Sequence, residues 1–473
     1  MAMKHYSSLP FSLIYYIRTT AAVRGSKITV ESMKKSPVDK WVVNPIQRFI
    51  NNSTTSGIVL FVSALLAVII ANSPWSEAYH HFWHRSFSIG FEDIMLTKDL
   101  HHWINDGLMA IFFFVVGLEL KREIIAGELR EPKKAAMPII GAIGGMVFPA
   151  LIYHFFNPIG PTAHGWGIPM ATDIAFALGV LYLLGDRVPL SLKVFLTALA
   201  IVDDIGAVLV IAFFYTSDIN LISLGFGAVF LLLLMASNMM GVRSIIYYAI
   251  IGIGGLWLAF LMSGVHATIA AVLAAMTIPA DVKVEDKDYI EKLNQLLQRF
   301  KQSTPSSSKT VTSDQLHILT EIRMYSKEAL TPLQLLEHSM HPFVAFIVMP
   351  IFAFSNAGVT ISGDIIHEIS SSVFLGTFFG LTIGKVIGVF GTMYVLRKLK
   401  IIEWPSDINN TFMLGAGFVA AIGFTMSLFV SNLSFKEQIY IDEAKMGILF
   451  ASVTASIIGY LIIRYAASKV PKT

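Results

Sequence analysis

Long runs of apolar residues recur along almost the whole chain and constrain its fold more than any other feature. A helix needs about 20 apolar residues to cross the roughly 30 Å hydrocarbon core of a bilayer. Of the 473 residues, 55% are hydrophobic and 14% are charged, whereas soluble proteins carry about 25% charged residues. This composition excludes a soluble globular fold and predicts an all-α polytopic membrane protein. We expect twelve transmembrane helices, near residues 57–74, 100–120, 135–156, 166–185, 190–215, 219–236, 245–262, 264–279, 342–359, 372–396, 411–431 and 444–466.

The basic residues fall almost entirely on one side of this arrangement. The two terminal segments and every second loop, together with Arg464 at the end of the last span, hold 29 of the 35 Lys and Arg residues; the opposite loops hold three, and the spans hold three more. Cytoplasmic loops are enriched in Lys and Arg, so we expect both termini in the cytoplasm. The net charge of only +3 gives no support for a nucleic-acid partner, and the absence of cysteine excludes disulfides, thiolate metal sites and thiol nucleophiles.

Two terminal regions flank the predicted transmembrane domain of residues 57–466, and one long loop lies within it. Residues 1–56 are basic and lack the small-residue cleavage site of a signal peptide, so we expect a cytoplasmic extension. Residues 280–340 form a long cytoplasmic loop, and residues 467–473 form a short cytoplasmic tail. The loop contains apolar residues at helical spacing, which predict either a half-exposed surface helix or a helix that faces the membrane or a partner; they are Ile290, Leu293, Leu296, Leu297 and Phe300.

Four ionisable residues lie near the middle of predicted spans, where each charge costs about 2.5 to 3.5 kcal/mol. The fourth span contains Asp173, the fifth contains Asp203 and Asp204, and the tenth contains Lys385. Lys385 taken alone is compatible with a structural Asp–Lys pair that ties two helices together. Three carboxylates facing one lysine, however, leave at least one acid that must be protonated, hydrated or bound to a cation.

The chemistry of these side chains favours a small hard cation. Carboxylate oxygens and the hydroxyl of Thr172, next to Asp173, are ligands suited to Na⁺ or Li⁺ rather than to a transition metal. Consecutive helical residues point about 100° apart, so Asp203 and Asp204 must have different roles. We predict that Na⁺ binds at Asp203 and Asp204 and that the protein needs no cofactor.

Glycine and proline predict that two spans are interrupted. The sequence around Asp173 reads GWGIPMATDIAFALG, and the eleventh span reads FMLGAGFVAAIGFTMS and includes Gly423. Broken helices at membrane depth are tolerated where they line a cavity, although glycine that only serves helix packing is the alternative for either span. The two interrupted spans would each be the middle member of an inverted repeat if spans 3–5 correspond to spans 10–12.

Eight motifs in order along the bundle resemble the bacterial NhaA-type sodium/proton antiporters. They are WINDGLMAIFFFVVGLELKRE (103–123), ATDIAFALG (171–179), LTALAIVDDIGA (196–207), SGVHATIA (263–270), LEHSMHP (336–342), FAFSNAGV (352–359), IGKVIG (383–388) and IGFTMSLF (422–429). The resemblance implies two interrupted helices that cross at mid-membrane within inverted repeats. It also implies electrogenic, pH-regulated exchange of Na⁺ or Li⁺ for protons across the inner membrane, and a homodimer with the 80–100 loop as a candidate contact.

The resemblance also implies roles for individual residues. Asp204 looks like the main cation ligand, and Asp203 looks like its proton-carrying or lysine-paired neighbour, with Asp173 and Thr172 in support and Lys385 compensating charge. The other residues with implied roles are Glu119 in a cytoplasmic funnel, Glu337, His338 and His341 in a pH-sensing region, His266 as a residue that shifts the pH profile, and Asp106 and Gly423 in support. Independently of the resemblance, a Glu and two His within five residues can change their net charge near neutral pH.

Other classes of membrane protein also place carboxylates within the membrane. An intramembrane aspartyl protease would use paired carboxylates to activate water, but the Gly-x-Gly-Asp signature of such enzymes is missing. A cation channel would not favour a mid-membrane lysine. An ion-coupled symporter of similar fold stays open, although an organic anion would need a basic or hydrogen-bonding pocket beyond Lys385.

Overall fold

The computed structural model describes residues 53–91, 94–216, 219–303, 310–360 and 368–469. The contacts divide the chain into two compact units, of which one holds residues 50–278 and 336–473, and the other holds residues 279–335 together with 1–49. The expected N-terminal extension lies almost entirely outside the described residues, and its nature stays a prediction. Each unit is described by itself.

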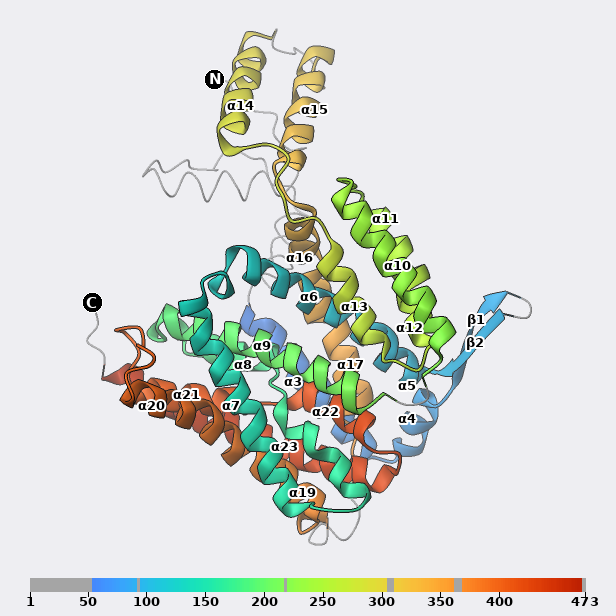
Figure 1. Ribbon diagram of the computed structural model, residues 1–473, viewed down its shortest axis with the longest axis vertical. Coiled ribbons are helices and arrows are strands. Elements are labelled where there is room, and N and C mark those ends of the chain that lie inside the picture. The colour runs from blue at the N-terminus through green and yellow to red at the C-terminus, as the bar shows by residue number, and fades with distance from the viewer. Residues whose placement is uncertain (1–52, 92–93, 217–218, 304–309, 361–367, 470–473) are drawn as a thin grey trace. The chain divides into compact units, whose positions relative to one another are not determined.

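The first half of the larger unit contains one β-hairpin among helices (Figure 1). Its elements, in which η marks a 3₁₀ or π-helical segment, are α3 (Ser53–Ala71), α4 (Ser76–Trp83), β1 (Ser86–Phe91), β2 (Ile94–Asp99), α5 (Leu100–His102), η2 (Trp103–Leu108), α6 (Met109–Ala126), η3 (Glu128–Arg130), α7 (Pro132–Phe156), η4 (Pro161–Met170), α8 (Ile174–Leu183), η5 (Gly185–Arg187), α9 (Leu190–Phe214), α10 (Leu221–Met239), α11 (Ile245–Ile251), η6 (Gly252–Trp257), α12 (Leu258–Leu261) and α13 (Ala267–Thr277).

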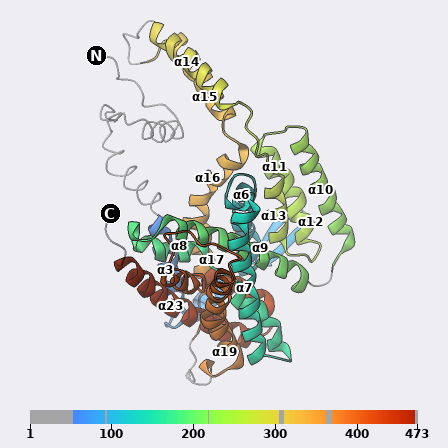
Figure 2. The same cartoon turned by 60° about the vertical axis from the view of Figure 1, so that its left-hand side comes forward.

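The second half of this unit is helical throughout its described residues. Its elements are α16 (Pro332–Phe343), whose first turn belongs to the smaller unit, η7 (Val344–Val348), α17 (Met349–Asn356), α19 (Ser372–Phe379), η8 (Gly380–Gly384), η9 (Ile387–Gly391), α20 (Thr392–Lys398), α21 (Asn410–Ala420), α22 (Phe424–Ser434) and α23 (Gln438–Ser468). Helix α23 packs along α19 and α21, and α7 packs along α9 and η9. Figures 1 and 2 show α10 and α12 beside α13.

Within the described residues, six helical segments are long and apolar enough to cross a membrane, and the number is nine if each bent helix pair is one span. The six are residues 132–156, 190–214, 221–239, 332–356, 372–398 and 438–468. These segments confirm a helical polytopic membrane protein, while the number of twelve stays a prediction. Helices at residues 245–261 and 267–277 are apolar but shorter, and they coincide with the seventh and eighth expected spans.

Two of the bent pairs lie where the sequence predicted interruptions. The segments η4 and α8 meet at 41° across residues 171–173, and α21 and α22 meet at 42° across residues 421–423. The third pair, α3 and α4, bends by 117°, so α3 alone corresponds to the first expected span. Both predicted interruptions are therefore present as backbone breaks.

The smaller unit contains a helical hairpin of α14 (Asp286–Gln302) and α15 (Ser313–Glu328). Its core is Leu296 packed against Ile318 and Ile322, and a hydrogen bond of 3.0 Å joins the hydroxyls of Tyr289 and Ser326. Helix α14 matches the helical spacing expected there. Ile290 and Leu297 are exposed while Leu296 is buried, so one face of α14 packs on its neighbour and its exposed apolar face is compatible with both expectations for this helix.

Candidate functional site

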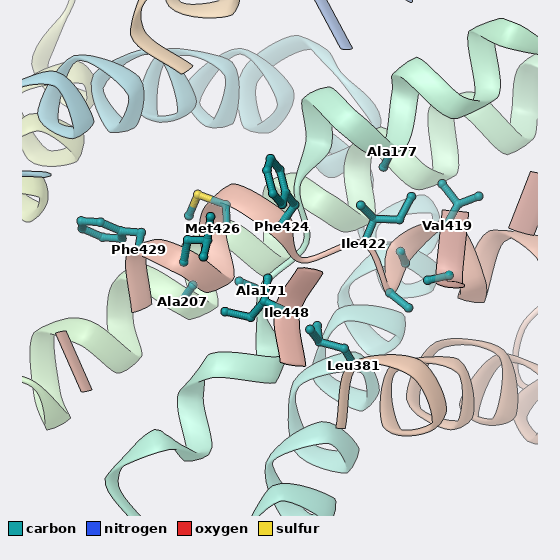
Figure 3. Packing of buried hydrophobic residues seen from close by; sticks show 14 of the residues in the cluster. Ala171, Ala177, Ala207, Leu381, Val419, Ile422, Phe424, Met426, Phe429 and Ile448 are labelled. Carbon is teal, nitrogen blue, oxygen red and sulfur yellow. The ribbon is translucent and has the colours of Figure 1, made fainter. Parts of the chain in front are cut away.

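The two backbone breaks lie against each other and are joined by hydrogen bonds. The N–H of Asp173 donates to the carbonyl of Ile422 at 2.7 Å, and the hydroxyl of Thr172 donates to the carbonyl of Ala420 at 2.7 Å. Broken helices leave backbone groups without intrahelical partners, and here each break supplies partners for the other. Figure 3 shows Ala171 beside the turn between Ile422 and Phe424. The contact places the start of α8 and the start of α22 side by side.

Asp173 caps both half-helices. Its carboxylate accepts the N–H of Phe176 at 2.9 Å at the start of α8, and it accepts the N–H of Thr425 at 3.1 Å at the start of α22. The hydroxyl of Thr425 also donates to Asp173. A negative charge is favourable at a helix N-terminus, so the partial positive ends of two helices offset the buried charge of Asp173.

Gly423 allows this close packing of the two breaks. A Cβ atom at this position would lie 2.8 Å from a methyl group of Leu381 and 2.9 Å from the carbonyl oxygen of Ala171. Both distances are shorter than real Cβ atoms show, so a larger residue would push the breaks apart. Gly423 therefore has a steric reason to be glycine at the contact between the breaks.

Asp203 and Lys385 form a buried ion pair. The Nζ of Lys385 lies 2.5 Å from Oδ2 of Asp203, and neither side chain is exposed. Lys385 also donates to the carbonyl of Met170 at the end of η4. The lysine thus links the tenth expected span to the fifth and to the break before Asp173. The second carboxylate oxygen of Asp203 has no hydrogen-bond partner in the part of the chain that the structure describes.

Asp204 is the unmatched carboxylate among the three. It is fully buried, and neither of its oxygens has a hydrogen-bond partner among the described residues. The negative charges of Asp203, Asp173 and Glu119 act on it, and the positive charge of Lys385 acts on it more weakly than these. A buried carboxylate without a donor is strongly unfavourable when ionised, so an ionised Asp204 would need a compensating positive charge at this position.

Small residues hold the lysine-bearing span close to α7. A Cβ atom at Gly384 would lie 2.7 Å from the Cα of Pro149, and one at Gly145 would lie 3.4 Å from the Cε of Lys385. Small residues allow such close approach between membrane helices. The π-helical segments η8 and η9 flank Lys385, and such segments are frequent at functional sites.

Glu119 and Glu337 lie in a second charged cluster. The charges of Glu337 and Arg122 act on Glu119, and the Nε of Arg122 lies 3.2 Å from a carboxylate oxygen of Glu337. His338 and His341 follow on the same helix, α16. Arg122 was not singled out from the sequence, although it lies in the motif that contains Glu119.

Asp106 and His266 lie near each other, away from the carboxylate site. Asp106 belongs to η2, His266 immediately precedes α13, and their charges act on each other. The carbonyl of Asp106 accepts the indole N–H of Trp257 at 3.4 Å. No local sequence pattern predicted this pairing, because 160 residues separate the two positions.

No group of three or more His, Asp or Glu residues with the geometry of a resident metal site occurs in the described part of the chain. Asp203 and Asp204 nonetheless place three carboxylate oxygens without hydrogen-bond partners in one buried region. Oxygen atoms of this kind suit a transported alkali cation. Thr425 binds Asp173, and the carbonyl of Met170 binds Lys385. Both groups are uncharged, so the search for charged residues within apolar spans could not identify them.

The family model described as Na⁺/H⁺ antiporter 1 matches residues 47–463. The chain belongs to this family. The match covers both breaks, the carboxylate site and the charged cluster around Arg122. It agrees with the resemblance drawn from the eight sequence motifs.

Curated relatives match over nearly the same region. The Na⁺/H⁺ antiporter NhaA of Oleidesulfovibrio alaskensis is 48% identical over 431 residues, which is 90% of this chain and 95% of the relative. The corresponding antiporter of Wolinella succinogenes is 47% identical over 416 residues, 88% of this chain and 92% of the relative. The Na⁺/H⁺ antiporter NhaA 1 of Clostridium beijerinckii is 44% identical over 431 residues, 91% of this chain and 97% of the relative.

Proposed function

We propose that this protein is a secondary transporter that exchanges Na⁺ or Li⁺ for protons, and that Asp204 is the main ligand of the transported cation. The observation that carries the proposal is a fully buried carboxylate with no hydrogen-bond donor among the residues that the structure describes, next to a second carboxylate that is paired with Lys385. The names of the relatives describe the same exchange. Neither a protease nor a symporter is favoured by any feature of the site.

Exchange follows from competition for the same oxygens. A buried carboxylate without donors is stable when protonated or when a cation binds it, and is strongly disfavoured as a bare anion. Loading Na⁺ therefore expels a proton, and loading a proton expels Na⁺. Asp203, with its charge balanced by Lys385, contributes its free oxygen to the cation or carries a second proton when the pair separates.

The half-helices hold this site in a fixed place. Asp173 and Thr172 tie the two breaks together, so we propose that the breaks belong to inverted repeats and cross at mid-membrane. Alternating access would then come from rocking of one helix group against the other around the site. Exchange of one Na⁺ for more than one proton would make transport electrogenic.

The remaining sequence predictions complete the proposal. Glu119 would attract cations from the cytoplasmic side, and Glu337, His338 and His341 would adjust activity to pH, with His266 shifting the profile. The protein would be a homodimer in the bacterial inner membrane with both termini in the cytoplasm. An even number of spans, such as twelve, places both termini on the same side of the membrane.

The proposal is tested by proton movement in everted vesicles from a bacterium that lacks its own sodium/proton antiporters. A pH-sensitive dye reports proton efflux from the vesicles when NaCl, LiCl or KCl is added at neutral and alkaline pH. Wild type should respond to Na⁺ and Li⁺, more strongly at alkaline pH. Asp204→Asn should abolish the response, because an amide can neither release a proton nor neutralise a cation.

Asp281→Asn is the matched control, because Asp281 is exposed and lies in the smaller unit. It should leave the response unchanged. An inserted wild-type protein that responds to no cation would refute the antiporter. An active Asp204→Asn variant would instead refute the assignment of the cation ligand.

A further inference from the structure

A second polar cluster lies at the end of the bundle that carries the β-hairpin, and it is not part of the carboxylate site. Its centre is Asn356, the last residue of α17, which is fully buried. Its partners are His101 and Asn105, which follow the β-hairpin in α5 and η2, and Asn432 in α22. Three separate segments of the chain therefore meet at one asparagine.

The hydrogen bonds of this cluster form a closed cycle. The Nε2 of His101 donates to Oδ1 of Asn356 at 3.0 Å, Nδ2 of Asn356 donates to Oδ1 of Asn105 at 3.2 Å, and Nδ2 of Asn105 donates to Nδ1 of His101 at 3.2 Å. Only a neutral His101 with its proton on Nε2 completes this cycle. Asn432 adds a bond of 2.6 Å to the same oxygen of Asn356. The amides are thus held in one orientation.

A layer of phenylalanines lies between this cycle and the carboxylate site. The ring of Phe429 lies 5.6 Å from that of Phe113 and 6.2 Å from that of Phe352, measured between ring centroids. All three rings are buried. They come from α22, α6 and α17, and α6 continues directly from η2. The same three segments therefore supply both the phenylalanines and the asparagines.

The two layers lie in line with the carboxylate site. Ala207 follows Asp204 by three residues on α9, and Phe429 follows Met426 by about one turn on α22 (Figure 3). All three residues belong to one apolar cluster. Asn432 then lies seven residues beyond Thr425, a rise of about 10 Å along the helix. Along α22 from Thr425, which binds Asp173, Phe429 with its ring partners comes first and Asn432 with the amide cycle comes second.

We propose that Asn105, Asn356 and Asn432, held by His101, form with the three phenylalanines the gate that closes the cation site towards the hairpin side. The proposal rests on the proposed antiport function, because only alternating access requires such a gate to open. Hydrophobic constrictions exclude water and ions. The hydrogen bonds of the amide cycle hold the three segments together on the hairpin side of the phenylalanines. Opening then requires α22 to move away from α17 and η2, which breaks the Asn432 bond and separates Phe429 from its neighbours.

This arrangement couples the gate to the site. The first turn of α22 holds Asp173 through Thr425, and its last turn contributes Asn432. A rigid movement of α22 therefore displaces both groups together. The bound ion and the gate can influence each other through a single helix of eleven residues.

The absence of native cysteine permits a direct test. The double variant Asn356→Cys, Asn432→Cys is bridged with a short bifunctional thiol reagent, and antiport is measured before bridging, after bridging and after reduction. Bridging should lower antiport by about tenfold or more, because the gate can no longer open, and reduction should restore it. Na⁺ should still raise the thermal stability of the bridged protein, because the site stays accessible from the other side.

Ser88→Cys, Thr97→Cys is the control pair, because these residues face each other across the hairpin with a 2.7 Å hydroxyl contact. Bridging it should leave antiport unchanged. Undiminished antiport in the bridged Asn356–Asn432 variant would overturn the gate while leaving the antiporter intact. Failure of the cysteine-free parent to exchange Na⁺ for protons would instead refute the proposed function.

A single variant tests the gate even if the double variant does not fold. The thiol of Phe429→Cys should react with a membrane-impermeant thiol reagent added on the hairpin side, faster during turnover than without ions. A thiol that stays unreactive there during measurable antiport would refute an opening at this position.

Discussion

The ion pair between Asp203 and Lys385 predicts a large and unequal response to mutation. Both side chains are fully buried, and Nζ and Oδ2 are 2.5 Å apart. Removing one partner of a buried pair costs about 3 to 5 kcal/mol, because it leaves the other charge without compensation. Replacing both partners by neutral groups of similar size costs much less. Asp203→Asn and Lys385→Met should therefore each destabilise the protein, and the double variant should be more stable than the sum of the two losses predicts.

Thermal unfolding of the purified protein in detergent measures this coupling. With a shift of about 2 °C per kcal/mol, the lower end for chains of 150 to 250 residues, Asp203→Asn should lower the melting temperature by roughly 6 to 10 °C. The double-mutant cycle should return a coupling of about 2 kcal/mol or more. Additive single effects would show that the two charges do not stabilise each other in the folded protein.

The exposed pair of Lys283 and Glu328 provides a matched comparison. Its atoms lie 2.7 Å apart, but the side chains are 57% and 41% exposed. Surface ion pairs contribute less than about 1 kcal/mol, so Glu328→Gln should change the melting temperature little. An equal fall in melting temperature for Glu328→Gln and Asp203→Asn would mean that burial does not determine the cost of breaking an ion pair.

Two further predictions concern packing and pH. Gly384→Ala places a Cβ atom 2.7 Å from the Cα of Pro149, so it should destabilise the protein by about 1 to 3 kcal/mol and reduce antiport, whereas Gly225→Ala, which meets open space, should have little effect on either. At the base of the hairpin, burial would raise the pKa of Asp99, but hydrogen bonds from the backbone N–H and ring of His102 outweigh it and lower that pKa. The contribution of Asp99 to stability is therefore complete above its ordinary pKa and is lost as the pH falls through the lowered value. Asp99→Asn should remove this acid dependence of the melting temperature, and an unchanged dependence would assign it to other groups.

The residues of the main site could be predicted from the sequence because charged residues are rare within apolar spans. Asp173, Asp203, Asp204 and Lys385 stand out against the cost of burying a charge, and the structure brings all four within one electrostatic neighbourhood. Helical geometry showed that Asp203 and Asp204 differ, but not which one pairs with Lys385. That choice depends on the rotation of two helices about their axes, which close packing through Gly384 and Gly145 determines.

Uncharged polar groups were much harder to find. Asn105 and Asn356 lie within motifs quoted for the family resemblance, yet an amide in an apolar segment carries no charge that demands a partner. Their importance lies in a cycle between residues about 250 positions apart, which no local pattern reveals.

In the proposed antiport, the division of roles between neighbouring aspartates lets one site serve two ions. If both carboxylates were paired with cationic side chains, neither would need a proton or Na⁺, and the site would be inert. If neither were paired, two adjacent buried charges would repel, and both would stay protonated. Lys385 satisfies Asp203 and leaves Asp204 unmatched, so the folded protein always requires one more positive charge at this place. Whether that charge is H⁺ or Na⁺ then depends on the concentrations on the side to which the site is open.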